Sequence, residues 1–342
     1  MRINALDYLR GLMALCIMVY HYFSWTFHAY DSATFLGVLG IYGVSTFYIL
    51  SGLTLYHVYN NKLHFSNLYS FFVKRIFRIL PLLWLSIFLN IFLLGQTYDL
   101  RTIFLNSSGL FGFIDHDNYI TTGAWSIGNE LVFYSVFPVI IILNKWKHYY
   151  TEIFFILSLV VAVYFAFWGL NSSGELANQW STYINPMNQI FLFIGGMTIG
   201  KIIGMKKSNI TSFLLFLFCV LFMLLYQNSG DKINLVSAWN RFIYSFISFV
   251  LTISFLLIDT TIINKTIDWV LSKLGHISYS LYLLHAIVFW TVAKFINRIE
   301  SPTLFLTVCF FGTITISYLS FNFLELKFSK LGKRLLTKAK LH

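Results

Sequence analysis

The residues with the clearest potential for chemistry are two ionisable side chains in the first apolar segment, Arg10 and His21. They are eleven residues apart, about three helical turns, so both project from the same face of a helix. His21 lies roughly 16 Å further along the helix axis than Arg10. Ionisable groups within a membrane-spanning segment are costly and mark candidate functional sites. This pair is therefore the first candidate.

A carboxylate, Glu130, lies about two turns from the start of another apolar segment. The segment that contains Glu130 crosses the membrane in the opposite direction to the first one. Glu130 therefore reaches a depth in the membrane similar to that of His21. A carboxylate beside a histidine raises the basicity of the imidazole and fixes its tautomer. We therefore predict that His21 and Glu130 are catalytic, with His21 a general base that Glu130 orients. The alternative is that each side chain only satisfies a polar neighbour between packed helices.

Two further arginines, Arg75 and Arg78, share one helix face at the entrance of the third apolar segment. Guanidinium groups bind phosphate oxygens through a planar fork. The same residues would also suit a basic membrane surface with anionic lipid headgroups. Arg10 lies at a comparable depth in the membrane, so we predict that Arg10, Arg75 and Arg78 together bind a phosphate-rich ligand. A phosphate-rich ligand with a thin arm reaching toward His21 has the shape of coenzyme A.

Five other side chains are candidates for binding substrate: Ser51, Trp125, Ser126, Tyr282 and His285. Trp125 would serve as a platform for a sugar or belong to the aromatic belt at the membrane surface. Ser126 and Ser51 are candidate hydrogen-bond donors to an oxyanion. His285 would line the same cavity or satisfy a helix-packing contact. No CxxC, HExxH or carboxylate cluster predicts a metal site.

The elements that must position these groups are membrane helices. Of the 342 residues, 58% are hydrophobic and only 11% are charged, whereas soluble domains carry about 25% charged residues. We predict an all-α polytopic membrane protein with a single domain over residues 1–342 and no metal. About ten segments are long enough to span a bilayer. They are 6–27, 36–59, 79–97, 124–143, 152–170, 188–204, 210–227, 240–258, 278–297 and 303–324.

The distribution of Lys and Arg predicts the orientation of these segments. With the N-terminus inside, 18 of the 24 basic residues fall on the inner side and 5 on the outer side. Cytoplasmic loops of membrane proteins are enriched in Lys and Arg, so both termini are predicted to be cytoplasmic. The net charge of +11 has the same explanation, and no nucleic acid is expected as a partner.

Several of these residues stand in motifs that resemble acyltransferase family 3, bacterial membrane O-acyltransferases that modify surface polysaccharides. Five stretches carry the resemblance, in the order of that family. They are Leu6-Asp7-Tyr8-Leu9-Arg10-Gly11 with His21, the segment 43–52 ending in Leu50-Ser51-Gly52, Lys74-Arg75-Ile76-Phe77-Arg78 with Pro81, Trp125-Ser126-Ile127-Gly128-Asn129-Glu130, and Gly275 to His285.

The resemblance implies that an acetyl group moves from cytoplasmic acetyl-CoA to a hydroxyl of an extracytoplasmic glycan or lipid-linked saccharide. It also implies that His21 is essential, that Arg10, Arg75 and Arg78 serve the donor, and that the protein lies among the lipids of a bacterial plasma membrane. The chain resembles the stand-alone type, without a hydrolase-like domain. His21 would act as a base or through an acetyl-imidazole. A flippase or transporter of a lipid-linked sugar is the alternative function.

Overall fold

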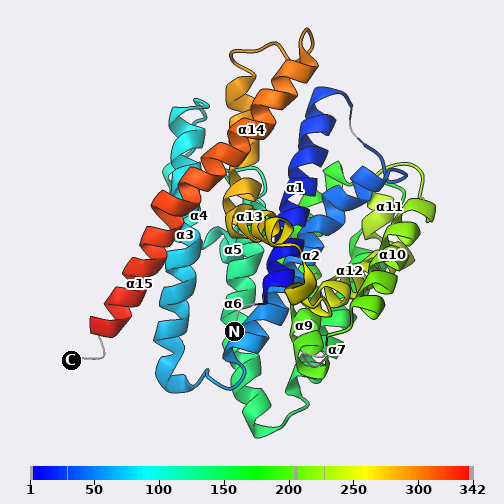
Figure 1. The fold of residues 1–342 in the computed structure, drawn as a ribbon, viewed down its shortest axis with the longest axis vertical. Coiled ribbons are helices and arrows are strands. Elements are labelled where there is room, and N and C mark those ends of the chain that lie inside the picture. Colours follow the sequence, from blue (N-terminus) through cyan, green and yellow to red (C-terminus); the bar gives the residue numbers. More distant parts are fainter. Residues whose placement is uncertain (1–2, 29, 204–206, 227, 339–342) are drawn as a thin grey trace.

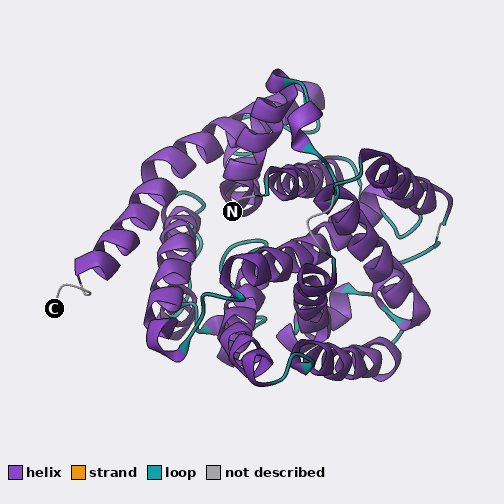
Figure 2. Ribbon diagram, turned by 60° about the horizontal axis from the view of Figure 1, so that its bottom comes forward, coloured by secondary structure: helices purple, strands orange, loops and turns teal. Residues whose placement is uncertain are grey.

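The computed structural model describes residues 3–28, 30–203, 207–226 and 228–338. Over these ranges the chain forms helices joined by loops, and they contain no strand (Figures 1 and 2). The predicted all-α class is confirmed.

The long helices run one after another along the chain, and shorter helices connect some of them. The long ones are α1 (Asn4–Thr26), α2 (Phe35–Tyr59), α3 (Leu68–Phe92), α6 (Ala124–Trp146), α7 (Tyr150–Tyr164), α9 (Pro186–Ile202), α10 (Asn209–Leu225), α12 (Ala238–Leu256), α13 (Lys265–Val292) and α14 (Pro302–Ser320). The shorter ones are α4 (Leu100–Ser108), α5 (Phe111–Ile114), α8 (Trp180–Ile184), α11 (Ile233–Val236) and α15 (Leu326–Lys338).

Six helical stretches of the described chain are long and apolar enough to cross a membrane. They are Phe35–Tyr59, Phe65–Phe92, Ala124–Trp146, Tyr150–Gly169, Ala238–Leu256 and Pro302–Thr337. The protein is therefore a multi-pass membrane protein. Each of the ten predicted spans overlaps one long helix, but the total of ten crossings and the cytoplasmic position of both termini stay predictions.

The start of the predicted span 79–97 was wrong, because α3 begins eleven residues earlier, at Leu68. Arg75 and Arg78 consequently lie about two turns inside a helix rather than at its entrance. Hydropathy detects the apolar part of a helix, and the charges of Lys74, Arg75 and Arg78 interrupt the apolar run of α3 and hide its true start. Both guanidinium groups therefore belong to the body of α3 and not to its first turn.

The predicted span 278–297 also began too late, because α13 begins at Lys265. Its first turns carry charged residues such as Lys265 and Asp268, which lower the hydropathy without ending the helix. The side chain of Asn264 caps the helix by accepting a hydrogen bond from a backbone N–H of the first turn. The helix therefore extends well beyond the part that hydropathy detects.

At the other end of the fold, the predicted span 303–324 continues as helix beyond its predicted end. A π-helical turn, Phe321–Glu325, joins α14 to α15. Figure 1 shows α14 and α15 as one long oblique rod whose lower half lies beside α3. The basic residues that follow Glu325, such as Lys327 and Lys330, thus lie on a helix packed against the one that carries Arg75 and Arg78.

Helix α1 packs against α13 and α2, and α2 packs against α9. Glycines permit the closest contacts, as is common between membrane helices. A Cβ atom on Gly11 of α1 would lie 2.7 Å from the backbone nitrogen of Gly275 of α13. Ten residues beyond this contact on each helix stand His21 and His285. The glycine contact therefore brings two imidazoles to the same level of neighbouring helices.

Substitution of Gly52 should destabilise the fold. A methyl group there would overlap the Phe193 backbone carbonyl on α9, so α2 and α9 must separate. Overpacking of this kind costs about 1–3 kcal/mol, more than the gain of about 1 kcal/mol from the higher helix propensity of Ala. Gly52→Ala should lower the midpoint of thermal unfolding in detergent.

Gly312→Ala is the matched control for that substitution. It lies in α14, and its Cβ would meet only Val288, at an ordinary 3.6 Å. We expect an unchanged or slightly higher midpoint. Equal destabilisation by both variants would contradict the assignment of close α2–α9 packing to Gly52.

Candidate functional site

Three cavities lie in a row between the long helices. The arginine vestibule has a volume of about 440 Å³ and is lined by Arg10, Arg75 and Arg78 among others. The same three arginines line one end of the central cavity, which is narrow at about 90 Å³. The histidine chamber, about 530 Å³, contains His21 in its wall. The central cavity and the histidine chamber share the side chain of Tyr282.

Two of the three arginines of the arginine vestibule have no direct anionic partner among the described residues, although Asp7 and Glu325 also line it. Arg10 pairs with Asp7 at 3.1 Å, one turn earlier on α1. Arg75 and Arg78 form no ion pair within 4.0 Å in the described part of the chain. The Arg75 guanidinium instead lies 5.7 Å from the ring centroid of Tyr134, and its Nε is buried without a hydrogen-bond partner. The structure thus brings together the three predicted arginines from α1 and α3.

Glu130 lies in the central cavity and not beside His21. Its carboxylate accepts a hydrogen bond from the Ser51 hydroxyl and another, at 2.6 Å, from the hydroxyl of Tyr134. The cavity that it lines also contains the three arginines. The predicted pairing of Glu130 with His21 is therefore wrong. A similar depth along two helices does not put two side chains on facing sides, and Glu130 instead faces the positively charged end.

The partner of His21 is a second histidine. His21 Nδ1 lies 2.7 Å from His285 Nε2. The His285 Nδ1–H donates to the backbone carbonyl of Tyr282 at 2.5 Å. The indole of Trp25, one turn further along α1, is parallel to the His21 ring, with 4.7 Å between centroids. His21 Nε2 has no hydrogen-bond partner among the described residues, so it remains open to a ligand in the histidine chamber.

His285 occupies a different position from the one predicted for a substrate-binding residue. Its side chain has no exposed surface, and both ring nitrogens are hydrogen bonded. Contact with a substrate would require these bonds to break. The two histidines are separated by 264 positions in the sequence, and no local pattern in either segment indicates that they meet. Only the packing of α1 against α13 brings them together.

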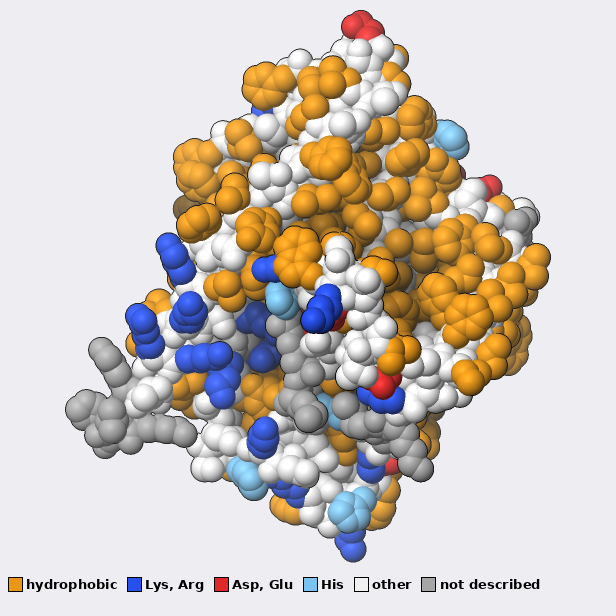
Figure 3. Space-filling view, in the orientation of Figure 1, with side chains coloured by type: hydrophobic (Ala, Val, Ile, Leu, Met, Phe, Trp, Pro, Cys, Tyr) orange, Lys and Arg blue, Asp and Glu red, His pale blue; other side chains and the backbone are white. Residues whose placement is uncertain are grey.

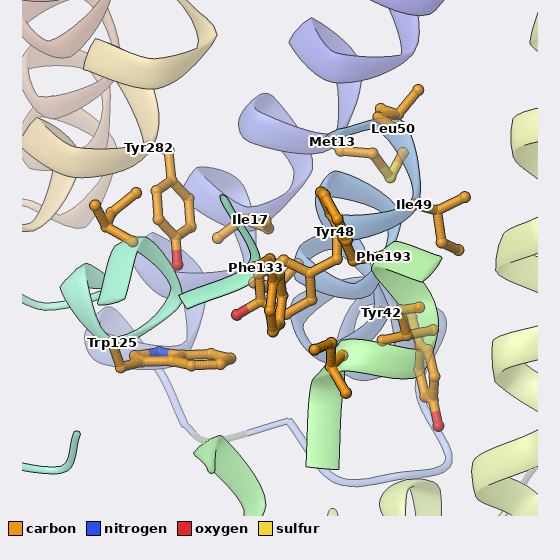
Figure 4. Packing of buried hydrophobic residues seen from close by; sticks show 14 of the residues in the cluster. Met13, Ile17, Tyr42, Tyr48, Ile49, Leu50, Trp125, Phe133, Phe193 and Tyr282 are labelled. Atoms are coloured by element: carbon orange, nitrogen blue, oxygen red, sulfur yellow. The ribbon is translucent and has the colours of Figure 1, made fainter. Parts of the chain in front are cut away.

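Tyr282 forms the boundary between the central cavity and the histidine chamber. Its hydroxyl donates to the Gly123 carbonyl at 3.1 Å and accepts from the Ser126 hydroxyl at 3.0 Å. Figure 4 shows this hydroxyl directed toward the helix turn that carries Trp125. Gly123 has φ +85°, a conformation that favours glycine. Tyr282 therefore lines both cavities and is held in place by hydrogen bonds that a ligand can replace.

Aromatic side chains form much of the wall of the histidine chamber. Trp125 lines it, with Trp180 packed edge-on at 5.6 Å between centroids. The Trp180 indole N–H donates to the hydroxyl of Tyr119 at 2.9 Å. Burial raises the pKa of Tyr119, so its hydroxyl stays protonated and can donate to a ligand. The predicted sugar platform, Trp125, thus lies in the chamber that also contains His21.

Sequence reasoning missed two charged residues of this chamber, Asp231 and Lys232. The Lys232 ammonium donates to the Tyr20 hydroxyl at 2.6 Å and lies 5.3 Å from the centroid of the same ring. Lys232 belongs to a connection between two predicted spans, and its position beside His21 results from the fold. Its one signal in the sequence was its place among the few basic residues predicted on the outer side.

No group of three or more His, Cys, Asp or Glu side chains that could hold a metal ion occurs in the described ranges. Comparison with protein-family models finds one that matches residues 3–321, and its description is an acyltransferase domain. No curated protein and no solved structure matches the chain.

Proposed function

Since the chain belongs to acyltransferase family 3, we propose that it moves an acetyl group from cytoplasmic acetyl-CoA to a hydroxyl of an extracytoplasmic glycan. The observation that carries this proposal is the row of cavities, with three arginines at one end and a histidine open to a chamber at the other. Acyl transfer across a membrane needs these features, because the donor and the acceptor enter from opposite sides.

The arginine vestibule suits the nucleotide end of the donor. Two guanidinium groups without anionic partners, Arg75 and Arg78, are available to phosphate oxygens, and Arg10 stands opposite them on α1. In Figure 3, Lys and Arg side chains gather in the lower half of the face shown, around a hollow, while hydrophobic side chains cover most of the upper half. Such a field attracts an anionic ligand to its binding site.

The central cavity suits the pantetheine arm, which is thin and uncharged. A volume of about 90 Å³ leaves no room for a nucleotide but admits an extended chain. For the thioester to reach His21, the hydrogen bonds of Tyr282 with Gly123 and Ser126 must give way to bonds with the ligand. Ser126 and Ser51 line this cavity and are the candidate donors to the oxyanion.

The proposed chemistry begins with the acceptor hydroxyl in the histidine chamber. His21 takes its proton as the oxygen attacks the thioester carbonyl. The new C–O bond forms, the C–S bond breaks, and the proton passes from His21 to the departing sulfur, which leaves as coenzyme A. A transient acetyl-imidazole on His21 would yield the same products by nucleophilic catalysis.

The acceptor side of the proposal rests on the composition of the histidine chamber. Ligand sites combine large apolar and aromatic surfaces with a few polar groups that set orientation. Trp25, Trp125 and Trp180 provide such surfaces, and Tyr119 and Lys232 provide hydrogen-bond donors. A sugar ring, with apolar faces and a rim of hydroxyls, suits this lining. The partners are therefore a glycan or lipid-linked saccharide and the surrounding lipids of a bacterial plasma membrane.

The experiment that tests this function uses the full chain in sealed vesicles. Acetyl-CoA labelled in the acetyl group is supplied on one side, and bacterial surface polysaccharide stripped of its O-acetyl groups on the other. We expect labelled ester on the polysaccharide and free coenzyme A on the donor side. A flippase would move a lipid-linked sugar without consuming acetyl-CoA. Movement of sugar with no thioester cleavage would overturn the proposal.

A further inference from the structure

We infer that His285 is a positioning residue that holds His21 in the tautomer with a bare Nε2, through a relay that starts at the backbone carbonyl of Tyr282. The inference deepens the proposed function, because it states how a buried imidazole acts as a base without a carboxylate partner. It also gives a role to a buried polar side chain that lines none of the three cavities.

The protons of the relay follow from the chemistry of its atoms. A carbonyl oxygen can only accept, so His285 Nδ1, which is 2.5 Å from the Tyr282 oxygen, carries a proton. In a neutral imidazole the other nitrogen is then an acceptor. His285 Nε2 therefore accepts the bond at 2.7 Å, and His21 Nδ1 donates it. The remaining nitrogen of His21, Nε2, is left unprotonated, as a general base requires.

Burial favours the neutral form of this pair. His285 has no exposed surface, and no carboxylate is hydrogen bonded to either ring among the described residues. A buried charge without a partner is strongly unfavourable. Lys232 and Asp231, which carry opposite charges, also line the chamber of His21. The Asp231 carboxylate accepts hydrogen bonds from the backbone N–H groups of Leu176 and Ile233 and from neither imidazole ring. A neutral relay is the arrangement that satisfies all these groups.

The rings are held in the orientation that the relay needs. Their planes differ by 14°, with 5.0 Å between centroids. Nitrogens 2.7 Å apart are closer than the roughly 3.5 Å of atoms in stacked contact, so the rings meet edge to edge. Trp25 covers one face of His21. The Gly11–Gly275 contact fixes the spacing of α1 and α13 ten residues before each histidine.

The test compares two substitutions of His285. His285→Phe keeps a buried ring but removes the acceptor for His21 Nδ1–H. His285→Gln restores an acceptor oxygen near the position of Nε2. We expect His285→Phe to lower kcat about 100-fold, within the range typical of general base catalysis, with KM for acetyl-CoA unchanged. His285→Gln should recover at least a tenth of the wild-type kcat.

A spectroscopic measurement separates positioning from a merely structural role. The ¹⁵N chemical shifts of labelled histidine distinguish protonated from bare ring nitrogens, and the His21 signals are those that vanish in His21→Ala. We expect a protonated Nδ1 and a bare Nε2 in the wild-type chain, and a mixture of tautomers in His285→Phe. Thr313→Val is the matched control, because it removes a buried hydrogen bond to Tyr22 beside the relay. It should leave both kcat and tautomer unchanged.

Two results would overturn the inference. One is a His21 tautomer that is the same in His285→Phe as in the wild-type chain. The other is a loss of kcat in His285→Gln as large as in His285→Phe. Failure of the proposed function is distinguishable, because then the wild-type chain would not cleave acetyl-CoA at all, while the tautomer measurement would still report on the relay.

Discussion

His21→Ala should lower kcat for acetyl transfer to the acceptor by about 100- to 10,000-fold, because proton transfer by a positioned base contributes about 10²–10⁴-fold. The substitution removes the imidazole side chain that opens on the histidine chamber. The arginine vestibule does not include His21, so binding of acetyl-CoA, measured by equilibrium dialysis in detergent, should change less than threefold.

The control for this prediction is His148→Ala, which removes an exposed histidine from the loop between α6 and α7. Its kcat should equal that of the wild-type chain. Transfer by His21→Ala at more than a tenth of the wild-type rate would remove His21 from the mechanism. A single turnover with labelled acetyl-CoA, quenched before the acceptor is added, distinguishes general base catalysis by His21 from catalysis through an acetyl-imidazole. Label bound to the wild-type chain and absent from the variant indicates an acetyl-imidazole.

The second large effect concerns the donor. The double substitution Arg75→Ala, Arg78→Ala should raise KM for acetyl-CoA by about 100-fold or more, because hydrogen bonds to charged groups contribute about 1.5–3 kcal/mol each. The two side chains share one cavity, so their effects should not be additive. KM for the acceptor should stay constant, since neither arginine lines the histidine chamber.

Lys74→Ala provides the matched control on the same helix. It removes one positive charge from α3, but Lys74 lies outside the vestibule and the central cavity. We expect less than a threefold change in KM for acetyl-CoA. Arg75→Lys and Arg78→Lys should each raise this KM, because Lys keeps the charge and loses the planar fork. An equal effect of Lys74→Ala would mean that overall charge, not these guanidinium groups, holds the donor.

Much of the fold was accessible from composition and hydropathy. The low content of charged residues and the long apolar segments predict membrane helices directly from the sequence, because a helix satisfies its own backbone hydrogen bonds in lipid. Helix starts were less accessible, as Leu68 and Lys265 show. Charged residues near the start of each helix, such as Lys74 and Arg75 in α3 and Lys265 and Asp268 in α13, lower the local hydropathy. Hydropathy reports contact with lipid rather than the limits of a helix.

The two ends of the candidate site were also predictable along single helices. The rise and twist of α1 set Arg10 and His21 about 16 Å apart on one face, and the structure places them in the arginine vestibule and the histidine chamber. Distances within one helix follow from regular backbone geometry, which does not depend on the neighbouring helices. For this reason the sequence alone determined which groups stand at each end.

Only the tertiary structure decided which side chains meet. The sequence paired His21 with Glu130 because their depths match, but the partner of His21 is His285, and Glu130 bonds to Ser51 and Tyr134. Depth is one coordinate, whereas a contact also requires the rotation of each helix about its axis and the choice of its neighbours. Those are set by close packing such as that of Gly11 on Gly275, which no local pattern encodes.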